Sequence, residues 1–172
     1  MRNKLIANFK SDEHTMEVID ESDVMDSEQV ISKIGDLVSL EFNAIETYEA
    51  AIERLDNLDY RAKMTEFLGE HERHLIQFCD AIIQEGGAPP DGADYKQFLT
   101  KGPVVIAAIG GDKSILQAML LNENLTNKLY ENANEEIYPG YIQLMLKQAL
   151  GDVRHHRVWI ESAIEQLDWI KN

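Results

Sequence analysis

Acidic and histidine residues interrupt four apolar stripes of the sequence near their midpoints. In chain order they are Glu41, His71, His74, Glu123, Asp152, His155 and His156. An ionised carboxylate in a dry core is costly unless it is paired or bound to a metal ion. Carboxylate oxygens and imidazole nitrogens from neighbouring helices suit iron, manganese or zinc. We therefore predict that these residues form one polar layer that binds a metal ion.

The spacing within each stripe does not decide which of these residues are metal ligands. His71 and His74 are three residues apart, so on a helix they share one face and can reach one ion. In the fourth stripe either His155 or His156 is the ligand, and the periodicity favours His156. Asp152 is either a ligand or a carboxylate that orients His156 from four residues away.

Each acid and aromatic residue in the stripes also has a purely structural interpretation. Glu41 and Glu123 are then core acids that are hydrogen-bonded or paired with arginine. Tyr48 and Tyr130 follow these two acids at the same spacing of seven residues. We expect the two tyrosines to be core aromatics that hydrogen-bond to the buried acids.

Helical periodicity dominates the sequence after residue 26. Apolar residues recur every three or four positions and predict four long amphipathic helices, over about 27–55, 60–85, 112–137 and 141–172. Asp26 and Asp112 are the predicted N-caps of the first and third helices. Gly86-Gly87 and the following prolines end the second helix. No convincing strand pattern is present.

The lengths of the connections predict the topology. Helices 1 and 2, and helices 3 and 4, are joined by only a few residues, so each pair forms an antiparallel hairpin. The long connection over 86–112 is sufficient to cross a bundle of about 40 Å. A short helix near Tyr95–Leu99 and the apolar run Val104–Ile109 fall within it. We predict an all-α bundle of two hairpins and one crossover over 27–172, preceded by a flexible acidic arm, 1–26, that can include one helical turn.

Several motifs resemble the ferritin-like superfamily over about residues 28–170. The spacing Glu-x6-Tyr occurs in the first and third helices, and the end of the second resembles bacterioferritins and the ubiquinone-biosynthesis hydroxylases. The fourth helix resembles bacterioferritin from His156 onward, whereas the segment from Asp152 to His156 resembles the hydroxylases. The motifs are Glu41–Tyr48, Glu123–Tyr130, His74-Leu75-x-x-Phe78 with Gly87-x-Pro89, His156-x-x-Trp159-Ile160-Glu161 and Asp152-x-x-His155-His156.

The resemblance implies a di-iron carboxylate site built from one Glu on each of helices 1 and 3 and Glu-x-x-His on helices 2 and 4. The sequence departs from that pattern. His71 stands three residues before His74, where the family has Glu, and Glu70 is one residue off. Val153 stands three residues before His156. The implied function is an iron-dependent oxidase or ferroxidase at a degenerate di-metal site, with O2 or peroxide as co-substrate.

Composition limits the alternatives. The net charge of −15 disfavours nucleic-acid binding, no apolar stretch is long enough to cross a membrane, and one cysteine excludes a multi-cysteine metal cluster. We expect a cytoplasmic homodimer. The alternative function is a metal-free bundle that serves as a structural or stress-related interaction module. Iron storage in a 24-subunit shell is a weaker option.

Overall fold

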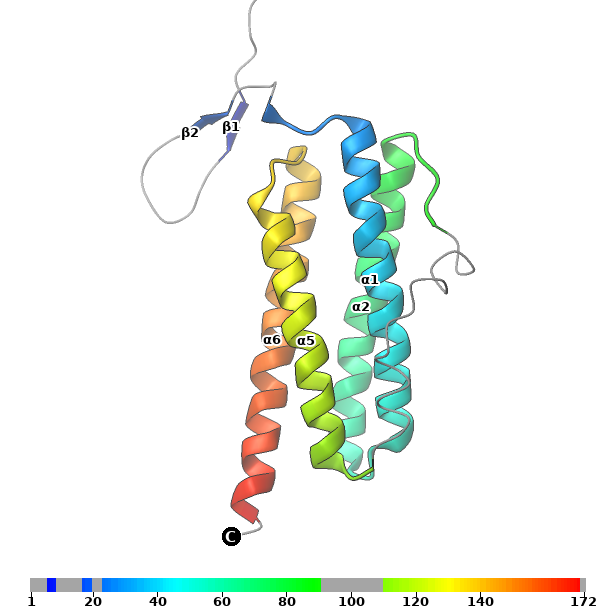
Figure 1. Cartoon of the computed structure of the whole chain (residues 1–172), viewed down its shortest axis with the longest axis vertical. Coiled ribbons are helices and arrows are strands. Elements are labelled where there is room, and N and C mark those ends of the chain that lie inside the picture. Colours follow the sequence, from blue (N-terminus) through cyan, green and yellow to red (C-terminus); the bar gives the residue numbers. More distant parts are fainter. Residues whose placement is uncertain (1–5, 9–16, 20–22, 91–109, 171–172) are drawn as a thin grey trace, which may run out of the picture.

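Four long helices form the body of the protein. The computed structural model describes residues 6–8, 17–19, 23–90 and 110–170. The helices are α1 (Ser27–Arg54), α2 (Leu58–Gln84), α5 (Asp112–Glu135) and α6 (Gly140–Ile170). They lie side by side along one axis (Figure 1). The predicted all-α four-helix bundle is therefore confirmed.

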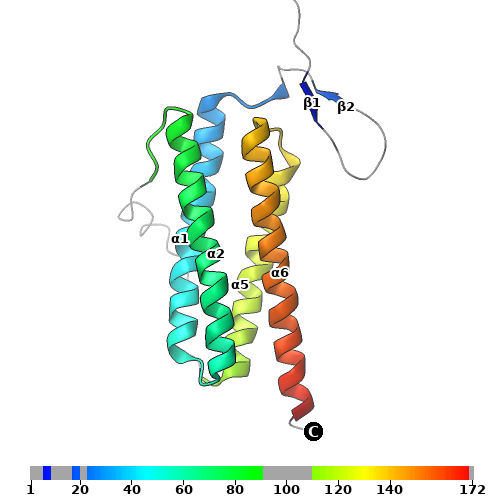
Figure 2. The same ribbon diagram turned by 180° about the vertical axis from the view of Figure 1, so that it is seen from behind.

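The helices are arranged as two antiparallel pairs. α1 packs on α2 and α5 packs on α6. α2 ends where α1 begins, whereas α5 begins at the opposite end of the bundle (Figures 1 and 2). Most of the predicted crossover, including 95–99 and 104–109, lies outside the described residues. No helix in the described part of the chain is long and apolar enough to cross a membrane.

The N-cap prediction is confirmed for the first helix and wrong for the third. Asp26 accepts the amide of Gln29, and the Gln29 side chain accepts the amide of Asp26, which completes a capping box. At α5 the N-cap is Gly111, with φ 83°. Asp112 is already inside the helix, and its carboxylate accepts the amides of Asp56 and Asn57 at 2.7 and 3.1 Å. Asp112 thus ties the start of α5 to the joint between α1 and α2.

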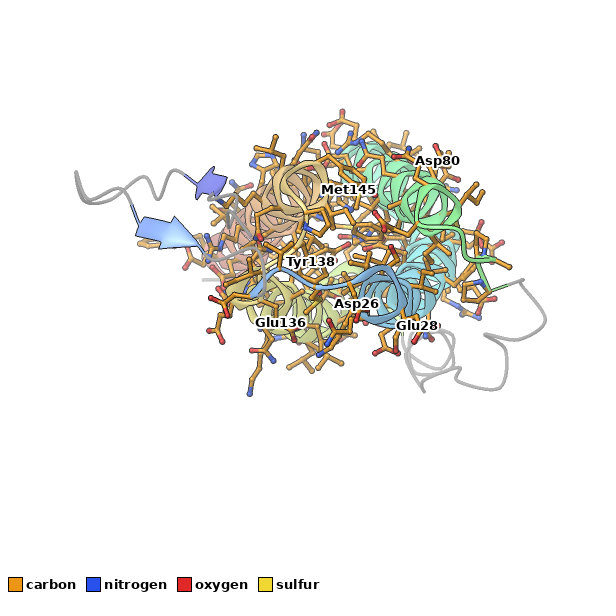
Figure 3. All side chains as sticks on the ribbon, turned by 90° about the horizontal axis from the view of Figure 1, so that it is seen from above. Asp26, Glu28, Asp80, Glu136, Tyr138 and Met145 are labelled. Atoms are coloured by element: carbon orange, nitrogen blue, oxygen red, sulfur yellow. The ribbon has the colours of Figure 1, made fainter. Side chains whose placement is uncertain are left out.

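A small strand pair lies within the region predicted as an acidic arm. β1 (Ile6–Asn8) pairs antiparallel with β2 (Glu17–Ile19), with Ala7 opposite Val18. The prediction of no strands missed this ladder, because three residues are too few to establish a two-residue alternation. Nearer to α1, the Met25 amide donates to the Ile137 carbonyl at 3.0 Å. Residues 23–26 cross that end of the bundle beside Tyr138 (Figure 3).

The core consists of two apolar clusters. One lies where α1 begins, α2 and α5 end and α6 begins, and includes Ile34, Phe78 and Leu146. The other surrounds the joint between α1 and α2, and includes Met64, Phe67 and Ile115. Along each helix, the acids and histidines of the predicted layer lie between residues of the two clusters. The polar layer therefore lies between the two apolar clusters along the bundle.

Candidate metal centre

Five ionisable side chains meet in the middle of the bundle. None has any solvent-exposed surface, and together they come from all four long helices: Glu41, His71, His74, Glu123 and His156. Such complete burial is rare for acids unless they have partners of opposite charge or bind metal. The sequence prediction of a shared polar layer therefore agrees with the placement of these five residues.

His71 lies between the two glutamates. Its Nδ1 is 2.7 Å from Glu41 Oε2, a hydrogen-bond distance. Its Nε2 is 3.4 Å from Glu123 Oε1 on the other side. The corresponding position on α6 is Val153, which is buried and apolar. Only α2 therefore inserts an imidazole between the carboxylates.

The other two histidines each contact one carboxylate at the rim and face another at the centre. His74 Nε2 is 3.0 Å from Asp152 Oδ2, and its Nδ1 is 3.8 Å from Glu41 Oε1. His156 Nε2 is 2.5 Å from Glu70 Oε2, and its Nδ1 is 3.7 Å from Glu123 Oε2. A carboxylate on the far nitrogen of an imidazole is the usual second contact of a metal-binding histidine.

The two tyrosines connect the hairpins crosswise. Tyr48 on α1 donates its hydroxyl hydrogen bond to Glu123 Oε1 on α5 at 2.9 Å. Tyr130 on α5 donates to Glu41 Oε1 on α1. Both phenols are fully buried. The prediction of core aromatics bonded to the buried acids is confirmed.

The layer has an approximate two-fold repeat that relates α1 to α5 and α2 to α6. Its equivalent pairs are Glu41 and Glu123, Tyr48 and Tyr130, Glu70 and Asp152, and His74 and His156. The position of His71 against Val153 breaks the repeat. This difference makes the two halves chemically unequal.

Charge interactions dominate the electrostatics of the layer. Burial raises the pKa of Glu41, but His71 and His74 together outweigh burial and lower that pKa to about 2. Burial likewise raises the pKa of Glu123, and His156 and His71 lower it to about 2. Burial lowers the pKa of His71, but Glu41 and Glu123 raise it to about 10. In the metal-free protein His71 is therefore a cation between two anions.

Two predicted site residues lie outside the fully buried centre of the layer. His155 is exposed on the surface of α6, where its ring contacts Phe67 at 5.9 Å between centroids. Asp152 lies at the rim of the layer with 26% of its side chain exposed. Its carboxylate forms an ion pair with Arg73 at 2.6 Å and also contacts His74. It does not orient His156, which was the alternative interpretation: the Asp152 carboxylate contacts Arg73 and His74 on α2, and His156 contacts Glu70.

Glu70 is the residue that the sequence reasoning missed. It stands four residues before His74, as Asp152 stands four residues before His156. In both cases the acid contacts the histidine of the opposite helix. The repeated spacing of acid and histidine on α2 and α6 was the available signal. The pattern Glu-x-x-His places the acid at position 71 instead.

The donor set fits a cation. Within the described part of the chain, four side-chain atoms of these five residues make no hydrogen bond: His71 Nε2, His74 Nδ1, Glu123 Oε2 and His156 Nδ1. Two groups, each of two histidines and one glutamate, offer ligand atoms within 4.8 Å of one another: Glu41, His71, His74 and His71, Glu123, His156. Unpaired buried polar atoms of this kind require either a proton or a metal ion between them.

Comparisons with known proteins support the same architecture. No protein-family model matches the sequence, and no curated protein matches it. Among solved structures, a bacterioferritin-related protein from Bacteroides fragilis, described as a dodecameric thioferritin, superposes with a TM-score of 0.74 at 16% identity, over 88% of this chain and 92% of that one.

Two further solved structures are similar. The first is a two-domain protein from Anabaena variabilis that contains DJ-1/ThiJ/PfpI-like and ferritin-like domains, with a TM-score of 0.73 at 14% identity over 83% of this chain and 41% of that one. The second is Dps from Thermosynechococcus elongatus, with a TM-score of 0.67 at 15% identity over 80% and 90%. The chain therefore has the ferritin-like fold.

Proposed function

We propose that the buried layer binds a divalent transition-metal ion, iron in the first instance, and that the protein is an iron-dependent oxidase or ferroxidase. One observation carries the proposal: imidazole nitrogens and a carboxylate oxygen that have no hydrogen-bond partner in the described part of the chain converge in a fully buried layer. The donor types suit Fe(II), with Mn(II) or Zn(II) as competitors. Bound iron would supply the one-electron chemistry with O2 or peroxide.

The protein residues have three tasks in this proposal. His71, His74, Glu41, Glu123 and His156 are the candidate ligands. Asp152 and Glu70 hold the outer Nε2 atoms of two histidines, so that Nδ1 of each ring faces inward. The two apolar clusters exclude bulk water from the layer and strengthen the attraction between the ligands and a cation.

The similar proteins support the proposal through what their names state. One is a bacterioferritin-related thioferritin and another is Dps. The dodecamer of the first also supports self-association, and we propose a homodimer here. We propose the cytoplasm as the location, since the single cysteine leaves no possibility of an intramolecular disulfide.

The test compares two adjacent histidines on α6. Purified protein is loaded anaerobically with Fe(II), desalted and analysed for metal, and its melting temperature is measured with and without chelator. We expect at least about one ion per chain, and a melting temperature that falls on chelation, because a ligand of the native state stabilises it. Addition of Fe(II) in air should produce an absorbance change in the near ultraviolet.

His156→Gln and His155→Gln form the matched pair. His156 is fully buried in the layer, whereas His155 is exposed. His156→Gln should lose the iron and the response to chelator, and His155→Gln should retain both. Wild-type protein with less than about 0.1 ion per chain and no absorbance change would contradict the proposal.

A metal-free structural role is the second candidate. It is favoured by the position of His71, because a charged imidazole between Glu41 and Glu123 compensates two buried carboxylates without any ion. In that case chelators leave the melting curve unchanged. The double substitution Glu41→Ala/Glu123→Ala should then lower the stability with or without chelator, since it leaves the buried His71 imidazole and the Tyr48 and Tyr130 hydroxyls without their partners.

A further inference from the structure

The unpaired atoms of the layer are distributed unequally between its two halves. Three of the four belong to one group: His71 Nε2, Glu123 Oε2 and His156 Nδ1. In the other group, Glu41, His71 and His74, the one further atom without a hydrogen bond among the described residues is His74 Nδ1. The approximate two-fold repeat would predict equal halves, so the inequality follows from the residue that breaks it.

Each oxygen of Glu41 already has a hydrogen-bond partner, with which an ion would have to compete. Tyr130 donates to its Oε1, and His71 lies at 2.7 Å from its Oε2. Its equivalent, Glu123, accepts a hydrogen bond from Tyr48 at Oε1, and its Oε2 has no hydrogen-bond partner among the described residues. The two carboxylates therefore have different tasks, although each stands at the same position of the repeat.

His71 can supply a metal-binding nitrogen to only one half of the layer. A neutral imidazole has one nitrogen that carries a proton and one with a free lone pair. The proton belongs on Nδ1, which lies within hydrogen-bond distance of Glu41, so the lone pair is on Nε2. That nitrogen faces Glu123 at 3.4 Å. A second ion on the side of Glu41 would require Nδ1 as well, and would displace its hydrogen bond.

The three unpaired atoms belong to side chains whose other polar atoms are already held. Nδ1 of His71 is hydrogen-bonded to Glu41, and Nε2 of His156 is hydrogen-bonded to Glu70 at 2.5 Å. Oε1 of Glu123 accepts a hydrogen bond from Tyr48. The stacking of the His156 ring on Phe67, with 4.1 Å between centroids, also fixes its plane. This is the arrangement in which outer contacts orient each ligand of a metal ion.

We infer that the layer is a single-ion site, in which His71 Nε2, His156 Nδ1 and Glu123 Oε2 bind one Fe(II) per chain and Glu41 is a positioning residue for His71. The inference rests on the proposed function and makes it specific. Two histidines and one carboxylate are the donor set of mononuclear non-haem iron sites, which leaves coordination positions open for a small oxidant. His74 and Asp152 then form a structural pair at the rim of the same layer.

Stoichiometry separates this inference from the proposed function. Co(II) is used as an oxygen-stable substitute for Fe(II) and titrated into chelator-treated protein by calorimetry, with metal analysis after desalting. We expect about one ion per chain. About two ions per chain would overturn the inference and leave the proposed function intact. No binding of either Co(II) or Fe(II) would overturn both.

His156→Gln and His74→Gln form the matched pair, because both histidines are fully buried and each contacts a rim carboxylate. We expect His156→Gln to weaken Co(II) binding by at least about 100-fold and His74→Gln by less than about 10-fold. Circular dichroism verifies that each variant is folded. Equal losses, or a larger loss in His74→Gln, would overturn the inference.

Proton NMR of the Co(II)-bound wild-type protein needs no variant. Each histidine ligand retains one ring N–H, on Nδ1 of His71 and on Nε2 of His156, and a paramagnetic ion shifts these signals far from the ordinary range. We expect two strongly shifted exchangeable signals, both of which disappear in D2O. Three such signals would indicate that His74 is also a ligand, and would overturn the inference.

Discussion

His71 Nδ1 lies 2.7 Å from Glu41 Oε2, and neither side chain has any exposed surface. The imidazole joins α2 to α1 in the centre of the molecule, where the similar di-iron sites implied by the sequence motifs would have a glutamate. A substitution of Glu by His at this position replaces an anion with a group that carries positive charge in the metal-free protein. The main chemical properties of the layer follow from this replacement.

The stability of the metal-free protein should be greatest between about pH 4.5 and 6.5. The pKa of His71 is raised from 6.5 to about 10, so its contribution is complete below pH 6.5 and is lost as the pH rises toward about 10. The pKa values of Glu41 and Glu123 are lowered from 4.5 to about 2, so their contributions are lost as the pH falls from 4.5 toward about 2.

Urea unfolding of chelator-treated protein across this range measures the effect. The rings of His74, His156 and Tyr48 surround His71 along with the two glutamates, so His71→Gln is the necessary comparison. The variant should lose most of the decline on the alkaline side. A wild-type unfolding free energy that is constant from about pH 6.5 to 9 would contradict the charge assignment.

His71→Glu should convert the layer toward a two-ion site. The substitution restores the spacing Glu-x-x-His before His74 and frees Oε2 of Glu41 from its hydrogen bond. Without metal, three buried carboxylates repel one another, and we expect a lower melting temperature than in the wild-type protein. Titration with Co(II) should give about two ions per chain. A value of one would contradict the assignment of His71 as the residue that limits the layer to one ion.

Tyr48→Phe and Tyr130→Phe should each destabilise the metal-free protein by about 1–3 kcal/mol, because each leaves a buried carboxylate oxygen without its donor. Tyr141→Phe is the control, since Tyr141 is 42% exposed and donates to an exposed carboxylate, Glu85. Its effect should stay within about 0.5 kcal/mol. Chemical denaturation measures all three. Equal small effects would show that the buried acids have other donors.

Glu70→Gln should weaken metal binding by about 10-fold or more without loss of the fold. The amide oxygen of glutamine still accepts from His156 Nε2, but the charge that makes the ring a better ligand is lost. Glu66→Gln on the same helix is the control, because Glu66 is exposed and pairs only with Lys63 among the described residues. Competition with a coloured chelator measures both affinities. Equal affinities in the two variants would remove Glu70 from the site.

The architecture was predictable because the apolar stripes are long. More than twenty residues in each helix establish the period, and local signals such as the Asp26 capping box define an end. The small strand pair at Ile6–Asn8 and Glu17–Ile19 was not predictable, since it is too short to have a period. Asp112 was misassigned because its partners, Asp56 and Asn57, are distant in sequence.

The composition of the polar layer was predictable, but its connections were not. Periodicity identified Glu41, His71, His74, Glu123 and His156, and each is fully buried. The same stripes did not reveal that Glu70 and Asp152 would reach across to the opposite helix, because the rotation of α2 against α6 decides those contacts. Nor do they show which atoms remain unpaired, and that property distinguishes one half of the layer from the other.

The most direct test of the account is an anomalous-difference map at the iron absorption edge, from a crystal loaded with Fe(II) under anaerobic conditions and grown without chelators. The account predicts one peak in the bundle centre per chain, in contact with Glu123, His156 and His71. A centre without any anomalous peak, with His71 still bonded to Glu41, would contradict metal binding by this layer.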